Sequence, residues 1–295
     1  GAGHWRTLFW AFAAQALIFA VLIRYFAAAD RTDAETKGVP AFQLAVLTLS
    51  VTSLGSAALV KESILAVLLV AASVAGFLTL LRIDRNADVR LLPREAGNLQ
   101  SAAGQGYFII FATEAAAIGF SVYGAAFLQA IHGLSPLLAG FIVGGIAAGW
   151  TLAALFVSRG GVTRDAYWLR LGVATILAST VFGSWAVPRA SPATVAIAMV
   201  LLGTGFGLCW AFVAKAIIAS LDNSERDAGS TAVPTAQLIG GAFGSAGAGA
   251  MAAALGFRDG IDPELAARVG PWVFMIFVPF GIAALAAANR LARRL

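Results

Sequence analysis

The sequence predicts an all-α integral membrane protein, and two observations carry this prediction. The 295-residue chain is 60% hydrophobic and 12% charged, with a mean hydropathy of +0.85, whereas roughly a quarter of the residues in soluble globular proteins are charged. The apolar residues lie in runs of about 20, which is the helix length that crosses a ~30 Å hydrocarbon layer. The alternating pattern of barrel strands is absent from the sequence, so each run is expected to form a helix that satisfies its own backbone polar groups.

Nine apolar segments follow one another, each bounded by charged residues, proline or glycine. In chain order they are Trp5 to Phe26, Ala41 to Val60, Ser63 to Leu81, Tyr107 to Ile131, Pro136 to Val157, Trp168 to Val187, Ala193 to Leu221, Thr231 to Leu255 and Gly270 to Asn289. The longest connection, residues 83–106, separates three helices from six. Its charged sequence, with Pro93, favours a cytoplasmic segment along the membrane surface.

Lysine and arginine residues between the segments predict the orientation of the chain. One set of alternate connections carries fourteen of them, including Arg82, Arg85, Arg90 and Arg94, and the other set carries five. Basic residues are retained on the cytoplasmic side of a membrane. We therefore expect a multi-pass protein of the cell (inner) membrane, with the N-terminus of this chain outside and its C-terminus in the cytoplasm.

The segment from Tyr107 to Ile131 carries a carboxylate, Glu114, well inside its apolar sequence. Such a residue costs roughly 2.5 to 3.5 kcal/mol in a spanning helix, and it usually faces a protein interior or a watery cavity on an ion or substrate path. Tyr107, Glu114 and Ser121 are seven residues apart and so share one helix face. We predict that this face lines the cavity of a solute transporter. The alternative is that Glu114 is hydrogen-bonded in a structural role.

Lys215 is a second charged residue inside an apolar segment, about 9 to 10 Å from its cytoplasmic end at 1.5 Å per residue. Glu114 lies at a similar depth, so the two side chains could form an ion pair that an arriving proton or cation would break. Alternatively, Lys215 extends to the lipid headgroups. Gln237, one turn after the helix-weakening Pro234, is expected either to line the cavity or to bond a neighbouring helix.

The sequence contains no pattern that indicates catalysis or metal binding. Cys209 is the single cysteine, and with only His4 and His132 it cannot form a Cys/His metal site. No nucleophile adjoins either histidine. We therefore expect no cofactor and no enzymatic activity. The formal charge of +5 lies in short clusters between apolar runs, which orient helices, so no nucleic-acid partner is expected.

Small residues four apart predict close helix packing. These are Gly140 with Gly144, Gly145 with Gly149, and Gly240 with Gly244 and Ala248. The run from Gly203 to Gly207 has alternating glycines, but it follows no strand and lies within an apolar segment. It is therefore not expected to bind phosphate.

Three stretches carry a family resemblance: HWRTLFWAFA (residues 4–13), GLSPLLAGFIVGGIAAGW (133–150) and ERDAGSTAVPTAQLIGGAFGSAGAG (225–249). They resemble, in turn, the start of the sixth helix, the start of the eighth core helix, and the loop with the eleventh core helix of the major facilitator superfamily, in its drug:proton antiporter branch with 14 helices. The resemblance implies a major facilitator-like helical bundle, of which this chain supplies the last nine of about 14 transmembrane helices.

The same resemblance implies a division of the chain into four parts. Residues 1–30 would be the last helix of the N-terminal bundle, 31–82 two linker transmembrane helices, 83–106 a cytoplasmic connection and 107–295 the C-terminal six-helix bundle. The missing N-terminal helices would then be a partner of this chain. In the family's gating loop, Arg159, Arg164 and Asp165 keep the charge of the family motif but not its spacing.

We predict a proton-coupled secondary transporter that exports small, drug-like or amphipathic molecules by alternating access, with Glu114 as the proton or cation carrier. Its partners would be a small-molecule substrate, protons and the lipid bilayer. Two alternatives remain open. One is a proton symporter for uptake of a metabolite or siderophore. The other is a truncated, non-transporting membrane protein.

Overall fold

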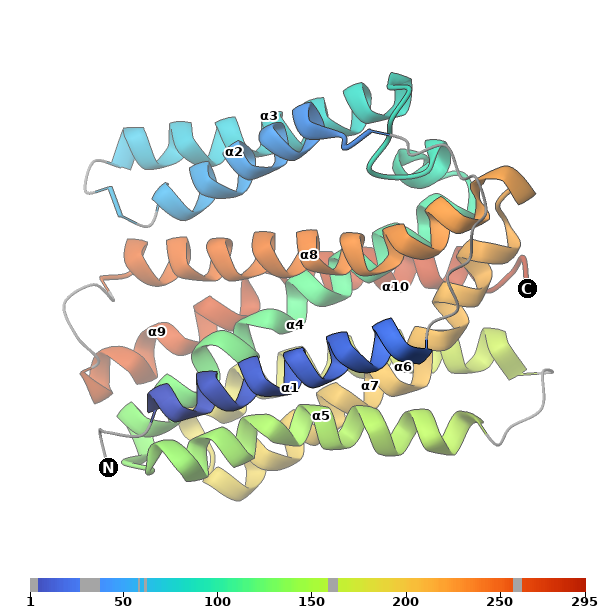
Figure 1. Cartoon of the computed structure of the whole chain (residues 1–295). Helices are drawn as coiled ribbons and strands as arrows, with labels where there is room; N and C mark the ends of the chain where they lie inside the picture. Colours follow the sequence, from blue (N-terminus) through green and yellow to red (C-terminus); the bar gives the residue numbers. More distant parts are fainter. Residues whose placement is uncertain (1–4, 27–37, 58, 61–62, 159–163, 257–261) are drawn as a thin grey trace. The chain divides into compact units, whose positions relative to one another are not determined.

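All nine predicted segments are helical in the computed structural model, which describes residues 5–26, 38–57, 59–60, 63–158, 164–256 and 262–295 (Figure 1). No strand occurs among these residues. The α-helices are α1 (Trp5–Phe26), α2 (Ala41–Ala57), α3 (Ser63–Asn86), α4 (Ala102–His132), α5 (Pro136–Ser158), α6 (Asp165–Arg189), α7 (Pro192–Ala219), α8 (Arg226–Ala254), α9 (Pro263–Met275) and α10 (Val278–Leu291). Two short 3-10 helices are η1 (Arg94–Gly97) and η3 (Asn223–Glu225).

Seven helical stretches in the described part of the chain are long and apolar enough to cross a membrane. They comprise α1, α3, α4, α5, α6, α7 and the pair α9 and α10 taken together. Helix α2 is apolar but only 17 residues long, and α8 is 29 residues long with a more polar sequence. The protein is therefore a multi-pass, all-helical membrane protein, as the sequence predicts.

The last predicted segment begins earlier than expected and is broken in two. Asp262 caps α9 by accepting a hydrogen bond from the backbone N–H of Leu265 at 3.0 Å, so the helix begins at Pro263 and not at Gly270. The break after Met275 coincides with Pro279 in the first turn of α10. Proline has no N–H to bond the carbonyl four residues earlier, and its ring crowds that carbonyl, so the regular helical hydrogen bonding is interrupted here.

The chain forms two compact units, Gly1–Gly38 and Val39–Leu295. The first contains α1, a 22-residue apolar helix. The second contains α2 and α3, packed as a hairpin, together with α4 to α10. The two helices that we expected to be linkers thus form one compact unit with the six-helix bundle, and α2 contacts α8 directly.

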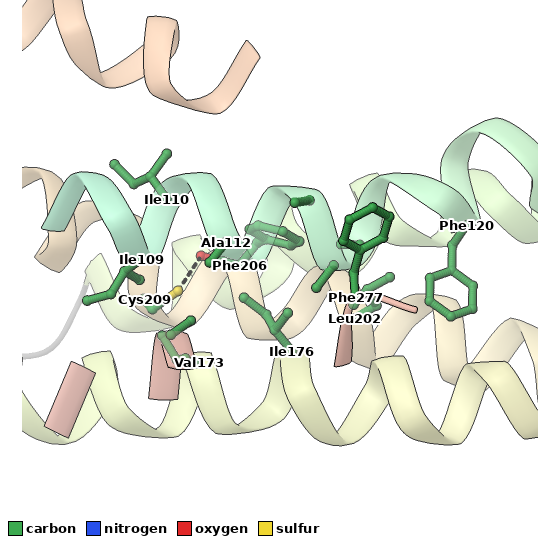
Figure 2. Packing of buried hydrophobic residues seen from close by; sticks show 14 of the residues in the cluster. Ile109, Ile110, Ala112, Phe120, Val173, Ile176, Leu202, Phe206, Cys209 and Phe277 are labelled. Carbon is green, nitrogen blue, oxygen red and sulfur yellow. Dashed lines mark hydrogen bonds between the residues drawn. The ribbon is translucent and has the colours of Figure 1, made fainter. Parts of the chain in front are cut away.

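Helix α4 is the centre of the second unit and contacts α5 to α10. It is longer than predicted because Ser101 caps it, with its hydroxyl oxygen accepting the N–H of Gly104 at 3.0 Å. Figure 2 shows its buried side chains beside those of α6 and α7. Phe120 of α4 is fully buried and stacks on Phe274 of α9, with ring centroids 4.4 Å apart.

Glycines permit close helix contacts in α7 and α8. A Cβ at Gly203 or Gly207 of α7 would overlap backbone carbonyls of α5, and one at Gly205 would crowd the backbone of α6. Residues two apart project to different sides of a helix, so the alternating run serves two interfaces. Gly240 and Gly244 of α8 lie against backbone carbonyls of α4 in the same way. The stretch from Gly203 to Gly207 is helical and therefore not a phosphate loop.

The prediction of close packing fails for one glycine pair. A Cβ at Gly140 or at Gly144 of α5 would meet no atom within 4 Å among the described residues. Gly149, by contrast, lies against the backbone of α7 at Val200. The spacing of small residues indicates a face that can pack closely, but a neighbouring helix must also lie on that face.

Candidate functional site

Helices α4 and α8 run parallel and are joined by three polar side-chain contacts. The Tyr107 hydroxyl donates to the carbonyl of Gly229 at 2.8 Å, and the Tyr123 hydroxyl donates to the carbonyl of Ser245 at 3.4 Å. Between them, the Gln237 amide Nε2 donates to Glu114 Oε2 at 3.3 Å. The partners are 122, 122 and 123 residues apart. The residue offset between the two helices therefore stays constant along their contact, and this alignment brings Glu114 and Gln237 together.

The Glu114 carboxylate bonds to a neutral amide and not to a cation. Among the residues that the structure describes, the ion pairs join Arg90 to Glu225 and Lys215 to Asp165, and neither includes Glu114. The side chain is half-buried between α4 and Gly241 of α8. A carboxylate in a membrane-spanning helix without a countercharge is costly. Binding a proton or a cation would remove much of that cost.

Glu114 lies on a distinct, less buried stripe of α4. Phe108, Phe111, Glu114 and Ile118 are half-buried and Ser121 is exposed, while most positions between them are buried. The spacing of three and four residues places them on one face. This stripe is the less buried side of α4, and it includes the carboxylate.

Tyr107, seven residues before Glu114, lies at a similar angle around α4 but is buried. Its side chain is 3% exposed, and its hydroxyl is bonded to the carbonyl of Gly229. The three residues of the predicted polar face therefore lie at similar angles around α4, but Tyr107 is buried, Glu114 is half-buried and Ser121 is exposed. Close packing against α8 covers Tyr107, and spacing along α4 alone does not reveal that neighbour.

Lys215 does not pair with Glu114, which corrects the ion pair considered from the sequence. Its Nζ lies 2.6 Å from Oδ2 of Asp165, at the start of α6. In this turn of α7, Ile217 faces α4, because a Cβ at Gly106 of α4 would overlap its side chain. Lys215 lies two residues before Ile217, about 200° away around the helix. The two charges therefore point to different sides, and their depth in the membrane stays a prediction.

The Lys215–Asp165 ion pair borders a cavity. The cavity has a volume of about 280 Å³ and lies between α5, α6 and α7, with Trp150 and Trp210 in its wall. Arg164 is exposed and directly precedes α6. Arg159, the other expected gating residue, lies outside the described residues.

Comparison with known proteins gives distant matches. No protein-family model matches the chain. Two curated proteins from two strains of Mycobacterium tuberculosis, each named a probable multidrug-efflux transporter, are 24% identical to it over 314 residues. The match covers 99% of this chain and 64% of each relative, so the chain spans less than two thirds of their length.

A solved structure gives the fold. A mutant of the nucleoside transporter NupG matches this chain with a TM-score of 0.50 and 15% identity, over 85% of this chain and 64% of that one. The helical bundle thus resembles a membrane transporter, and the major facilitator-like fold expected from the sequence is confirmed. The described helices therefore share the fold of that structure. Its placement in a branch with 14 helices stays a prediction.

Proposed function

We propose that this chain is part of a proton-coupled transporter that exports small, drug-like or amphipathic molecules. The observation that carries the proposal is Glu114, a carboxylate within a spanning helix that is half-buried and bonded to a neutral amide at 3.3 Å. Export is favoured over uptake because both curated relatives are named for multidrug efflux.

In this mechanism a proton and a cationic or amphipathic substrate compete for the Glu114 carboxylate. Protonation removes the charge, which lowers the cost of closing the surrounding helices over the site. Gln237 can donate to the ionised carboxylate and can accept from the protonated one, because an amide carries both kinds of group. Gln237 would thus hold the side chain in place in both states. Ser121 would extend the polar surface of the stripe.

The number of helices in the complete protein, the division of this chain and the gate are also proposals. Nine helices of fourteen would make up 64% of a complete chain, which agrees with the share of the relatives that is covered. This agreement supports a partner set of N-terminal helices, and the division at residues 30, 82 and 106 stays a prediction. The ion pair between Asp165 and Lys215, beside Arg164, would fasten α6 to α7 at the cytoplasmic end as part of a gate.

The test is proton-gradient-dependent efflux of ethidium from cells that express the protein from its complete gene. We expect Glu114→Gln, which keeps the shape but loses the charge, to reduce coupled efflux at least tenfold at equal membrane expression. Glu264→Gln is the matched control, because Glu264 is exposed in the first turn of α9, and it should transport normally. Normal efflux by Glu114→Gln would refute the role of the carboxylate. Accumulation of substrate with the gradient would favour the uptake alternative.

A further inference from the structure

Four consecutive residues after α3, Val89 to Leu92, are held by three different parts of the second unit. Gln43 of α2 donates from its side-chain amide to the carbonyl of Val89 at 2.8 Å. Asp84 of α3 accepts the backbone N–H groups of Leu91 and Leu92 at 2.6 and 2.9 Å. These contacts tie both helices of the α2–α3 hairpin to the connection that leads into α4.

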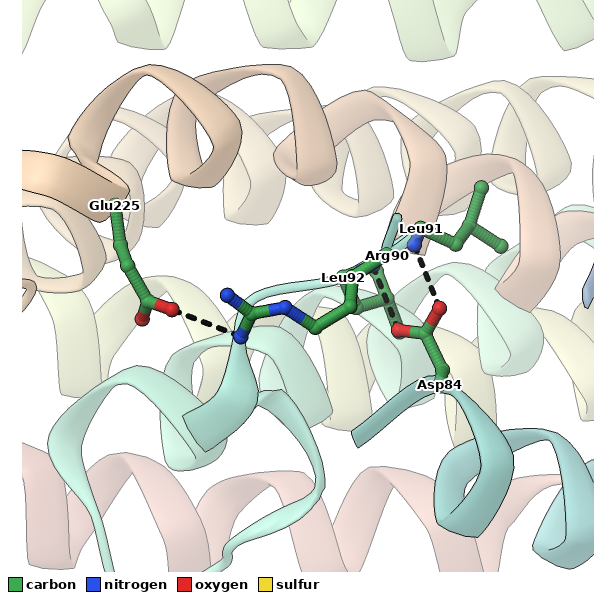
Figure 3. Close-up of polar contacts among 5 residues, drawn as sticks. All are labelled: Asp84, Arg90, Leu91, Leu92 and Glu225. Atoms are coloured by element: carbon green, nitrogen blue, oxygen red, sulfur yellow. Dashed lines mark hydrogen bonds and ion pairs between the residues drawn. The ribbon is translucent and has the colours of Figure 1, made fainter. Parts of the chain in front are cut away.

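The remaining residue of this stretch, Arg90, connects it to the start of α8. Arg90 Nη1 lies 2.8 Å from Oε1 of Glu225, which directly precedes α8 (Figure 3). Both side chains are about one fifth exposed, so the ion pair is partly shielded from water. We call the group Gln43, Asp84, Arg90 and Glu225 the clasp.

Two of the clasp residues, Gln43 and Asp84, are polar and almost fully buried, and burial of such groups is costly. Gln43 is 5% exposed and Asp84 is 3% exposed. A buried carboxylate is stable only when it is well bonded, and here two backbone N–H groups supply charge-assisted bonds. The arrangement is therefore specific and not a solvated loop with incidental charges.

The opposite end of the hairpin is loosely attached. A cleft of about 690 Å³ separates the end of α2 and the start of α3 from the end of α8, and its walls consist of alanine, valine and glycine residues, among them Ala57, Val67, Ala71, Ala250 and Ala253. Between helices in a membrane there is no hydrophobic driving force, so specific contacts decide which helices stay together. Along the interface, Phe77 of α3 meets Phe243 of α8 with ring centroids 5.4 Å apart. Attachment is concentrated toward the clasp.

We propose that the clasp joins the α2–α3 hairpin to the α4–α10 bundle as one mechanical body, so that the hairpin moves with this bundle. The statement about movement during transport rests on the proposed function, whereas the joining of the two parts does not. Removing the ion pair of the clasp should therefore release the hairpin while the bundle stays folded.

Two buried thiols can report on the hairpin and the bundle separately. Cys209 of α7 is 3% exposed and reports on the bundle. Ser73 of α3 is fully buried, and Ser73→Cys combined with Cys209→Ala reports on the hairpin. Maleimide labelling of the purified full-length protein is followed while the temperature rises. In the parent protein we expect both thiols to become reactive at the same temperature.

Arg90→Ala should lower the labelling temperature of the hairpin thiol by roughly 2–4 °C while that of Cys209 stays unchanged. The double variant Arg90→Glu with Glu225→Arg should restore it. Arg94→Ala is the control, because Arg94 is exposed in the same connection. If the two thiols already differ in the parent, or if Arg90→Ala shifts both or neither, the proposal is wrong. None of these results depends on transport.

Movement is tested by a covalent replacement of the ion pair. Arg90→Cys with Glu225→Cys, in a Cys209→Ala background, is treated with a short bismaleimide, and ethidium efflux is measured before and after. We expect the cross-link to form and efflux to be retained. A cross-linked protein that is stable but does not transport would show that the hairpin must separate from the bundle. Absence of efflux from the uncrosslinked parent would count against the proposed function alone.

Discussion

At the scale of single residues, Tyr107 and Glu114 show how packing separates two positions that the sequence pairs. Both lie on α4, seven residues apart, and both bond to α8. Tyr107 is 3% exposed and bonds to Gly229 in the first turn of α8, whereas Glu114 is half-buried beside Gln237 and Gly241. Spacing along α4 groups the two residues, and packing against the neighbouring helices decides how far each is covered.

Tyr107→Phe should therefore affect stability and not transport. The substitution removes a buried hydrogen bond to the carbonyl of Gly229, which contributes about 1 kcal/mol to the free energy of unfolding. We expect a lower thermal unfolding temperature in detergent and normal ethidium efflux. A loss of efflux at unchanged unfolding temperature would instead assign Tyr107 to the transport path.

At the scale of elements, the contact between α4 and α8 combines polar bonds with backbone-to-backbone packing. Gly240 and Gly244 let the carbonyls of Phe111 and Ala115 approach α8 closely. Such contacts hold the register that aligns Glu114 with Gln237. The alignment of Glu114 with Gln237 thus depends on glycines, which carry no functional group.

Gly240→Ala should disturb this interface, because the added Cβ would overlap the carbonyl oxygen of Phe111. Overpacking of this kind costs about 1–3 kcal/mol, so we expect a lower unfolding temperature and reduced efflux. Gly140→Ala is the matched control, since a Cβ there meets no described atom within 4 Å. Equal effects of the two variants on unfolding temperature would show that helix propensity, and not the contact with α4, sets the outcome.

At the scale of the whole molecule, the clasp and several basic residues, among them Arg94 and Arg294, lie at one end of the second unit. The end of α3, the start of α8 and the end of α10 meet there (Figure 1). Arg294 near the C-terminus donates to the carbonyl of Gln100 in the same connection, at 2.8 Å. The charge distribution that predicts a cytoplasmic end thus coincides with the most polar tertiary contacts.

Single cysteines can test the orientation in a Cys209→Ala background. Asp88 is exposed in the connection after α3, and Ser135 is exposed in the turn between α4 and α5. We expect Ser135→Cys to react with a membrane-impermeant maleimide added to intact cells, and Asp88→Cys to react only after the membrane is permeabilised. The reverse pattern would invert the predicted topology.

The sequence by itself determined the helical class, the positions of the nine segments and the presence of charges inside two of them. These are local properties, since hydropathy, run length and breakers such as Pro279 act within one stretch of chain. Ser101 and Asp262 are N-cap residue types that mark the starts of α4 and α9. The predicted segments begin later, at Tyr107 and Gly270, because they follow the apolar runs alone.

Only the tertiary structure decided which residues face one another. Lys215 binds Asp165 and not Glu114, Glu114 binds Gln237, and Arg90 binds Glu225 across more than a hundred residues of chain. The clasp contacts of Gln43 and Asp84 were likewise missed, although a polar residue at the end of an apolar segment was a visible signal. A sequence fixes the angle of a side chain around its own helix. The neighbour at that angle depends on how all the helices pack, because close contact between backbones is set jointly by both partners.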